Sequence, residues 1–395
     1  MDNLAIACRR AVAVEPGQAV AALVAAWAAL RLTGPFRAVL DLAAPLESVP
    51  DLPAADQMRL QWVMSGALHH LGDLAGAEQR LARGLALADL CPDRQADRAR
   101  LLAWQAALQR LRGRNDDAAA TAALALALAL QCGDNAVRLR LLNTIGSLAL
   151  SQGRLNEATT AFTQALAIAH TLGDQRWQGG AHGNLGIVCH DQGRRPEALA
   201  HFRRAVALAL QVGDRAFEAN SRCNLGLLLH ELGDNTAAVD ELALAARTAR
   251  ELGHRRLEHT VRCNLAIVKE ALGQIDAALD DYRQAIAQAA ALNDPHSEGQ
   301  FRGYLALLLA RQGRADDAGR CFDEAAALLA GTDDPATQAL LESQWAVAAR
   351  LGGDPDRADA LQAHAESLAA PLGLGEDSEV RRLLDEARSI LDAAK

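Results

Sequence analysis

The chain has 395 residues, of which 50% are hydrophobic and only 3% aromatic, and its formal net charge is −9 at pH 7. This acidic balance, with no basic arm, argues against a nucleic-acid groove, because phosphate binding needs clustered positive charge. With so few aromatic residues, the core must be built from Ala and Leu, which requires closely packed helices.

The N-terminal segment does not resemble a targeting signal. Arg9 and Arg10 follow the first apolar residues, which is not the order of a signal peptide. The longest mostly apolar runs are Ala19–Leu30 and Ala118–Leu130, of 12 and 13 residues, and a membrane helix needs about 20. We therefore expect a cytoplasmic protein that does not contact a membrane, with Ala118–Leu130 forming a helix buried on most sides.

Glycines recur at a fixed interval along the chain. Seven of them are spaced 40 residues apart: Gly113, Gly153, Gly193, Gly233, Gly273, Gly313 and Gly353. A fixed period of 20–50 residues is typical of a solenoid built from stacked repeats. Solenoids present long surfaces that bind a partner, so the period favours binding over catalysis.

Other residues repeat in phase with these glycines. Five repeats have an Ala, an aromatic residue or Leu four positions later, and an Ala three positions after that, as in Ala198, Phe202 and Ala205. This spacing places all three on one stripe of a helix. A small residue precedes each stripe where two helices must approach closely: Gly146, Gly186, Gly226, Ala266 and Ala306. We expect Phe162, Phe202, Tyr282 and Phe322 to be buried against the small residues of their own repeats.

These features resemble the tetratricopeptide repeat in a 40-residue form. The segments that begin at Gly183 (GNLGIVCHDQGRRPEALAHFRRAVALALQVGD) and at Cys223 (CNLGLLLHELGDNTAAVDELALAARTARELG) are similar to repeats of the Partner-of-Inscuteable-type adaptors. They are more similar to the C-terminal repeat regions of large bacterial ATPase-type and kinase-type regulators. The resemblance implies an all-α, right-handed superhelical solenoid of about nine helix-turn-helix repeats.

The pattern divides the chain into three parts. Residues 1–53 are expected to hold an N-terminal helix and a degenerate first repeat, marked by Trp27, Gly34 and Ala38. Residues 54–373 form the solenoid. Residues 374–395 form a capping helix, because a terminal repeat must be covered to stay soluble. The apolar residues of this helix are Val380, Leu383, Leu384, Ala387, Ile390 and Leu391.

No pattern of catalytic or metal-binding residues is present in the sequence. Phosphate-loop, dinucleotide-binding, zinc-protease and serine-hydrolase motifs are absent, and the glycines of Gly179–Gly186 lie within a helical register. His190 and His230 are one repeat apart, too far to share a zinc ion without a third ligand. The seven cysteines include no CxxC pair and are expected to be buried thiols in a reducing compartment. We expect no enzyme, cofactor or metal.

One set of polar residues is a candidate binding site. Asn184, Asn224 and Asn264 occupy the same position in three successive first helices. In the family that the chain resembles, first helices line the inner wall, and Asn at this position often binds the backbone of an extended peptide. A carboxamide both donates and accepts a hydrogen bond, so it can bind a peptide unit whatever its side chain.

Further residues extend this candidate site. Arg222, Arg262 and Arg302 lie two residues earlier in the same kind of helix, and Tyr304 continues the asparagine position. The alternative is structural: the asparagines bond the neighbouring helix, and the arginines pair with acids four residues earlier. Those acids are Glu218, Glu258 and Glu298.

The resemblance implies an adaptor that binds a peptide segment or a protein partner in its concave groove. A second hypothesis is the sensor arm of a bacterial signalling or transcription system, which binds a small ligand or a signalling peptide. A third class, the repeat-containing phosphatases that act on response regulators, needs an extra N-terminal helical bundle, and residues 1–17 are too few for one.

Overall fold

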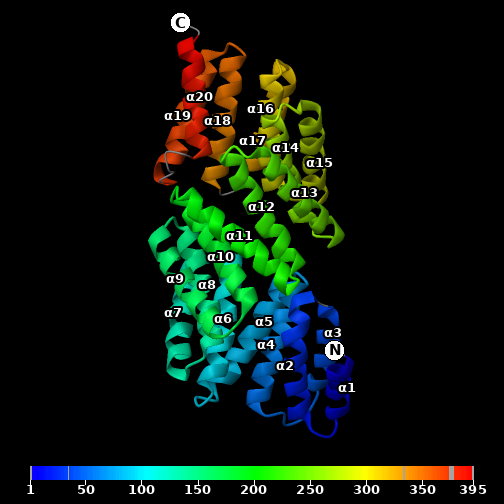
Figure 1. The fold of residues 1–395 in the computed structure, drawn as a ribbon. Coiled ribbons are helices and arrows are strands. Elements are labelled where there is room, and N and C mark those ends of the chain that lie inside the picture. The colour runs from blue at the N-terminus through cyan, green and yellow to red at the C-terminus, as the bar shows by residue number, and fades with distance from the viewer. Residues whose placement is uncertain (1, 34, 332–333, 373–377, 394–395) are drawn as a thin grey trace. The chain divides into compact units, whose positions relative to one another are not determined.

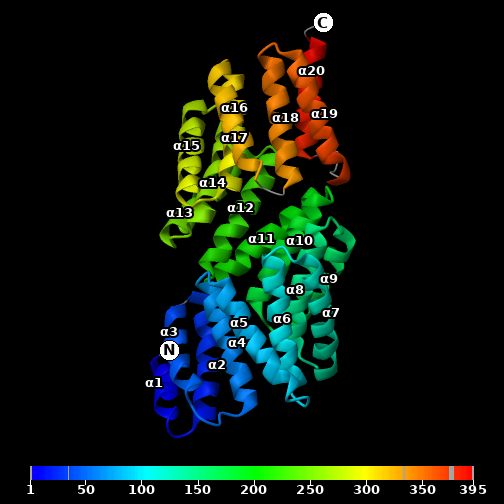
Figure 2. The same ribbon diagram turned by 180° about the vertical axis from the view of Figure 1, so that it is seen from behind.

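The computed structural model describes residues 2–33, 35–331, 334–372 and 378–393. Over these residues the secondary structure is entirely helical, so the expected all-α class is confirmed (Figures 1 and 2). The α-helices are α1 (Asp2–Ala11), α2 (Pro16–Thr33), α3 (Phe36–Glu47), α4 (Ala54–His70), α5 (Leu74–Asp89), α6 (Gln95–Leu111), α7 (Asn115–Cys132), α8 (Asn135–Ser151), α9 (Leu155–Thr171), α10 (Gln175–Asp191), α11 (Arg195–Val212), α12 (Arg215–Glu231), α13 (Asn235–Glu251), α14 (Arg255–Ala271), α15 (Ile275–Ala291), α16 (Pro295–Arg311), α17 (Ala315–Leu329), α18 (Pro335–Leu351), α19 (Pro355–Ala369) and α20 (Glu379–Ala393). A short 3₁₀ helix spans Ala370–Leu372.

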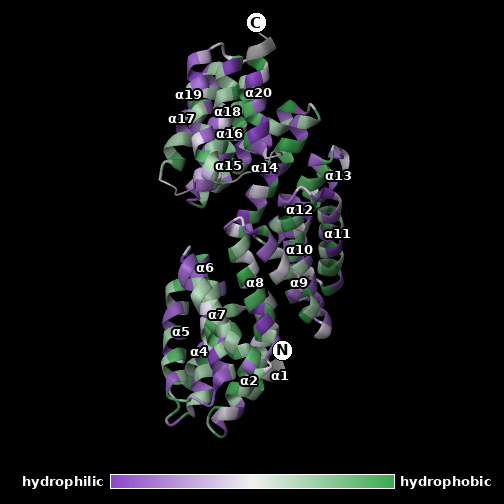
Figure 3. Ribbon diagram, turned by 90° about the vertical axis from the view of Figure 1, so that its left-hand side faces the viewer, coloured by the Kyte–Doolittle hydropathy of each residue, from purple (hydrophilic) through white to green (hydrophobic). Residues whose placement is uncertain are grey.

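The chain forms two compact units, residues 1–177 and 178–395. In each unit, consecutive helices pack as antiparallel pairs, such as α6 with α7 in unit 1 and α12 with α13 in unit 2. From α2 to α19 the described residues make nine such pairs, as the 40-residue period predicts. Figure 3 shows hydrophobic and hydrophilic residues mixed along the helices, as expected when each helix buries one face.

A glycine fixes the turn inside each repeat. Gly193 ends the turn between α10 and α11 with φ +74°, and a glycine is at the corresponding turn of the neighbouring repeats. This backbone conformation is strained for residues with a Cβ. Gly153, Gly193, Gly233, Gly273 and Gly313 all lie in turns between helices, as a 40-residue helix-turn-helix repeat requires. Gly34 lies outside the described residues.

The turn between repeats combines a left-handed residue with an N-cap. Gly213 has φ +70° at the end of α11, and the carboxylate of Asp214 then accepts a hydrogen bond of 3.1 Å from the backbone N–H of Phe217. Two repeats further on, Asn293 takes the left-handed conformation in place of glycine, with φ 51°. Asn tolerates this conformation better than most residues with a side chain.

The five repeats from α8–α9 to α16–α17 are each held together by a large side chain packed on a small residue. Phe162, Tyr282 and Phe322 are 0% exposed and Phe202 is 3% exposed, so their predicted burial is confirmed. A Cβ placed on Gly186 would lie 2.5 Å from Cε1 of Phe202, closer than real Cβ atoms approach. The absence of a side chain at Gly186 therefore sets how closely α10 approaches α11.

Two expectations about burial are wrong. Helix α7 buries only a stripe that includes Ala118, Ala122 and Ala125, whereas Leu124 and Leu130 are 51% and 54% exposed. Because α7 is a second helix, it is covered on one side only. The thiols are also not all buried: Cys132, at the end of α7, is exposed, and Cys91 and Cys321 are half-buried.

First helices lie on the inner side of each unit. In unit 2, α12 contacts α14 and α14 contacts α16, whereas the second helices contact the following first helix instead of one another over the described residues. In unit 1, α4, α6 and α8 follow the same arrangement. The smaller spacing of first helices means that they line the concave side of the stack.

Helix α20 covers the last repeat pair. It packs mainly on α18 and less on α19, so it takes the place of a further first helix. Val380, Leu383, Leu384 and Ala387 are buried and Ile390 is partly buried, in agreement with the predicted capping helix. The side chain of Leu391 lies outside the described residues.

The packing of Phe202 gives a first testable prediction. Phe202→Ala should lower the free energy of unfolding by about 3–5 kcal/mol, because the truncation leaves a cavity beside Gly186. Chemical denaturation followed by circular dichroism measures the loss. Leu210→Ala is the matched control, because Leu210 lies on the same helix and is 53% exposed; its effect should stay within about 0.5 kcal/mol. Equal losses in the two variants would contradict this account of the repeat.

Candidate binding surface on the first helices

The three asparagines predicted from the sequence lie at equivalent positions of α10, α12 and α14, and each is half-buried. We call Asn184, Asn224 and Asn264 the asparagine ladder. The Nδ2 atom of Asn264 donates a hydrogen bond of 3.3 Å to Sγ of Cys223 on α12. At least this member of the ladder therefore links two neighbouring first helices.

The three arginines form ion pairs. Arg222 donates from Nε to Glu218, one turn earlier on α12, at 2.8 Å, and also pairs with Glu241 on α13. Its side chain is only 12% exposed. The arginine therefore joins a first helix to the second helix of its own repeat.

Arg262 and Arg302 make the same two kinds of contact. Arg262 pairs with Asp281 on α15 at 3.0 Å and with Glu258 at 3.5 Å. Arg302 pairs with Glu298 at 2.8 Å and with Glu324 on α17. The pairing with acids four residues earlier, which was the structural alternative for these arginines, is thus present in all three helices. Their charges are neutralised within the repeats.

A histidine pair replaces this ion pair in the repeat formed by α10 and α11. The Nδ1 atoms of His182 and His201 are 2.9 Å apart. The two residues are 19 positions apart, as are Arg222 and Glu241. Sequence reasoning missed this pair, although alignment of the repeats puts His182 in the arginine position. Two neutral imidazoles can share one hydrogen bond, with one as donor and the other as acceptor.

Tyr304, at the end of the ladder, is covered by α20. Its hydroxyl donates a hydrogen bond of 2.9 Å to Oε2 of Glu379. Its ring stacks on Tyr282, with ring centroids 6.4 Å apart, and burial raises the pKa of both tyrosines. Because Glu379 is 75 residues away in sequence, no local pattern could have predicted this contact.

A cavity of about 310 Å³ lies beside this contact in unit 2. Side chains from five helices line it, including His230 of α12, Glu270 of α14, Tyr282 of α15, Arg311 of α16 and Glu379 of α20. The guanidinium of Arg311 bridges Glu270 and Glu386 at 2.8 and 2.9 Å. The lining therefore combines apolar side chains with an arginine that is paired with two carboxylates.

Unit 1 carries aromatic and cationic side chains on its first helices. The guanidinium of Arg100 lies 5.8 Å from the ring centroid of Trp62, and that of Arg140 lies 5.2 Å from Trp104 and 5.8 Å from Trp177. These distances are within the range of cation–π attraction. Trp104 is two 40-residue periods before Asn184, so it occupies the ladder position in unit 1, a residue that sequence reasoning missed.

The part of the chain that the structure describes contains neither a cluster of metal ligands nor a membrane-spanning helix. In the described parts of the chain, no three His, Cys, Asp or Glu side chains are grouped as a metal site requires. None of the described helices combines the length and apolar character needed to cross a membrane.

Comparisons with known proteins agree with the repeat geometry. Sequence profiles described as tetratricopeptide repeat match residues 139–170 and 177–251. The chain therefore contains tetratricopeptide repeats within residues 139–251. No curated protein matches it significantly in sequence.

Solved structures of the tetratricopeptide-repeat type resemble the chain in fold at low sequence identity. A Rap protein complexed with Competence and Sporulation Factor has a TM-score of 0.68 at 17% identity, covering 90% of this chain and 99% of that one. The apo quorum sensor NprR from B. thuringiensis has a TM-score of 0.66 at 13% identity, covering 89% and 99%. A signal transduction ATPase with a tetratricopeptide repeat sensor from Pyrococcus horikoshii has a TM-score of 0.60 at 15% identity, covering 90% of this chain and 54% of that one. At such identities the likeness shows the fold.

The histidine pair predicts a pH dependence of stability. Burial lowers the pKa of His201 below its ordinary value of 6.5, so the unfolded chain binds more protons than the folded one as the pH falls. Stability from this group is therefore present above about pH 6.5 and is lost on acidification. The midpoint temperature of thermal unfolding should therefore be lower at pH 5 than at pH 7.

A double variant isolates this contribution. His182→Arg with His201→Glu reproduces the Arg222–Glu241 pair of the next repeat, whose charges persist over that pH range. The fall in the midpoint from pH 7 to pH 5, measured by scanning calorimetry, should be smaller in the double variant than in the wild type. Equal falls would show that the pair does not set the acid sensitivity.

Proposed function

We propose that this protein is a non-catalytic adaptor that binds a peptide segment or a protein partner on the first-helix surface of its repeats. The observation that carries the proposal is the asparagine ladder, Asn184, Asn224 and Asn264, which repeats a half-buried carboxamide on successive first helices. A carboxamide at each step suits the peptide backbone, which offers a donor and an acceptor at every residue.

The spacing of the helices supports an extended ligand. Packed helices lie about 8–10 Å apart, and an extended chain rises about 3.3 Å per residue. Successive carboxamides of the ladder therefore meet every third residue of an extended peptide. Such contacts to the backbone bind many sequences, and specificity must come from the side chains around them.

The arginines have an indirect part in this proposal. Arg222, Arg262 and Arg302 fix each first helix to its second helix through their ion pairs. They thereby hold the helices that carry the asparagines and Tyr304 in place. We propose that they belong to the binding surface as supports for the ladder, and that the carboxamides make the direct contacts.

A second candidate function is the sensor arm of a bacterial signalling system that binds a signalling peptide or a small ligand. The observation that favours it is the likeness in fold to three proteins whose names concern signalling: a Rap protein, a quorum sensor and the sensor region of a signal transduction ATPase. Co-purification of the full chain with a kinase or a transcription regulator from the native cell would favour this second function over a general adaptor.

The ladder is tested by Asn224→Ala. Peptides selected from a random library against the full chain serve as probes, and their affinity is measured by fluorescence anisotropy. One lost hydrogen bond to the peptide backbone removes about 0.5–1.5 kcal/mol, so affinity should fall by up to about tenfold. The thermal midpoint should change little, because Asn224 is half-buried and polar.

The control is Asn156→Ala, since Asn156 is an exposed residue of the second helix α9. It should leave peptide affinity unchanged. A clear loss of stability in Asn224→Ala with unchanged affinity would show that the ladder connects the repeats and does not contact the ligand.

A further inference from the structure

Helix α20 is amphipathic and uses its apolar side to pack within unit 2. Val380, Leu383, Leu384 and Ala387 follow the i, i+3, i+4, i+7 spacing of one helical face, and all four are buried. They belong to the same hydrophobic cluster as residues of α16 and α18. The apolar stripe explains why α20 packs on the neighbouring helices. The charged residues beside the stripe determine its position along them.

Two carboxylates of α20 match two groups of α16. Glu379 accepts a hydrogen bond from the hydroxyl of Tyr304. Both carboxylate oxygens of Glu386 accept hydrogen bonds of 2.9 Å from the guanidinium of Arg311. The two glutamates are seven residues apart, and so are Tyr304 and Arg311. Residues seven apart lie on one face of a helix two turns along. The match therefore fixes both the register and the parallel direction of α20 on α16.

The contacts of α20 extend beyond the last repeats. Arg311, which holds Glu386, also pairs with Glu270 of α14, and the cavity beside Glu379 is lined by His230 of α12. Burial raises the pKa of Glu379, as expected for a carboxylate enclosed between helices. Covering the last pair requires contact with α18 and α19 alone. Helix α20 instead also lies against α16, at the end of the ladder.

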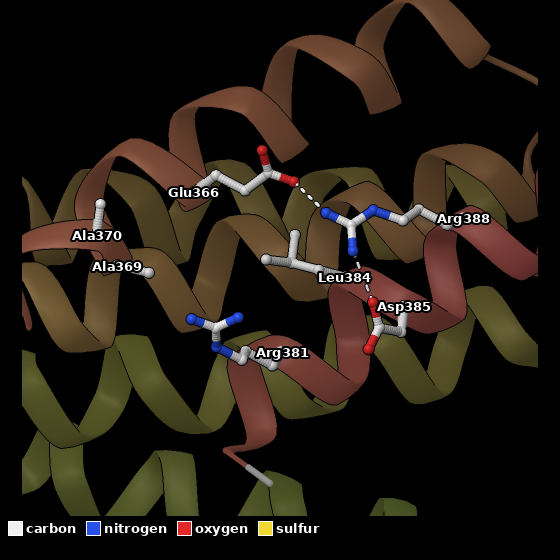
Figure 4. A pocket seen from close by; sticks show the side chains of 7 residues that line it. All are labelled: Glu366, Ala369, Ala370, Arg381, Leu384, Asp385 and Arg388. Carbon is white, nitrogen blue, oxygen red and sulfur yellow. Dashed lines mark hydrogen bonds and ion pairs between the residues drawn. The ribbon is translucent and has the colours of Figure 1, made fainter. Parts of the chain in front are cut away.

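The side of α20 that faces α19 is held differently. Figure 4 shows Arg388 of α20 directed toward Glu366 of α19, with Leu384 between the two helices and Arg381 and Asp385 at the edges. The Arg388–Glu366 distance is 2.6 Å, and both side chains are about half exposed, at 51% and 44%. A hollow of about 230 Å³ remains there. Exposed ion pairs contribute little to stability, so α20 is held mainly through its apolar stripe and the enclosed contact between Glu379 and Tyr304.

We propose that the face of unit 2 formed by α16 and α18, bordered by His230 of α12 and Glu270 of α14, is a binding site for an amphipathic helix that carries two carboxylates seven residues apart. Helix α20 is its resident occupant, and a partner protein with such a helix replaces it. This proposal rests on the proposed function, because it specifies the partner of the same first-helix surface. It also implies that a ligand that reaches Tyr304 competes with Glu379.

Tethering sets the strength of the competition. A segment joined to its site by a short linker has an effective concentration in the millimolar range. A free helix of equal affinity at micromolar concentration therefore binds little of the wild-type protein. Weakening the contacts of α20 must raise the affinity for a free helix that retains those contacts.

The experiment uses the full chain and a labelled peptide that copies residues 378–393. Leu383→Ala removes buried side-chain volume from the apolar stripe of α20, and we expect it to raise the affinity for the peptide at least tenfold by fluorescence anisotropy. Hydrogen exchange should show faster exchange of the α20 amides. Adding Tyr304→Phe and Arg311→Gln to this variant should lower the affinity again, because both remove groups that hold the glutamates.

Asp385→Asn is the matched control, because Asp385 pairs within α20 with Arg388 and not with α16. It should leave the affinity at the wild-type value, and a copy peptide with Ala at position 383 should not bind. If Leu383→Ala fails to fold by circular dichroism, the double variant Glu379→Gln with Glu386→Gln replaces it, with the same expected gain. No gain in a folded variant overturns the proposal and shows that α20 is a permanent part of the core.

The outcomes separate this inference from the proposed function. Selected peptides that lose affinity in Asn224→Ala but bind Leu383→Ala as they bind the wild type leave the proposed function standing and overturn helix exchange. A gain for the copy peptide together with no effect of Asn224→Ala supports helix exchange and contradicts the ladder.

Discussion

The packing of one large side chain on one small residue determines the geometry of the five repeats from α8–α9 to α16–α17. Phe202 fills the space that Gly186 leaves, and Phe162 does the same at Gly146. This contact fixes how closely the first helix approaches the second, and hence which residues of the first helix remain on the inner side. The position of the asparagine ladder follows from it, because Asn184 is two residues before Gly186. In a chain with 3% aromatic residues, these few rings account for much of the precision of the fold.

Polar pairs at the edge of each repeat vary while the packing beneath them is constant. The position occupied by Arg222 and Glu241 holds Arg262 and Asp281 in the next repeat, and a pair of histidines in the preceding one. Partly buried ion pairs give modest net stabilisation, because desolvation offsets much of the attraction. The presence of a polar pair at this position in successive repeats therefore serves the orientation of the first helices more than the total stability. The histidine repeat is the one in which we predict a dependence on pH.

Features with a short sequence range could be predicted, and those that join distant segments could not. The turn at Gly193 and the burial of Phe202 depend on residues within one 40-residue period, so the repeat pattern alone was sufficient. The apolar stripe of α20 was predicted for the same reason. The Arg222–Glu241 and His182–His201 contacts depend on how two helices face each other, which composition does not specify. The contact between Tyr304 and Glu379 spans 75 residues, and no periodic signal links these two positions.

The contact between α20 and Tyr304 changes how the surface of unit 2 must be understood. A ladder of carboxamides suits an extended chain, whereas α20 is a helix that binds through apolar residues and two carboxylates. The two modes use adjacent parts of one face, since Asn264 and Tyr304 occupy the same position of neighbouring first helices. A ligand confined to Asn184, Asn224 and Asn264 leaves the Tyr304–Glu379 contact in place. A longer ligand must break that contact, and with it the end of the helix that covers the last repeat. The length of the ligand would then decide whether binding also displaces the end of α20 that contacts Tyr304.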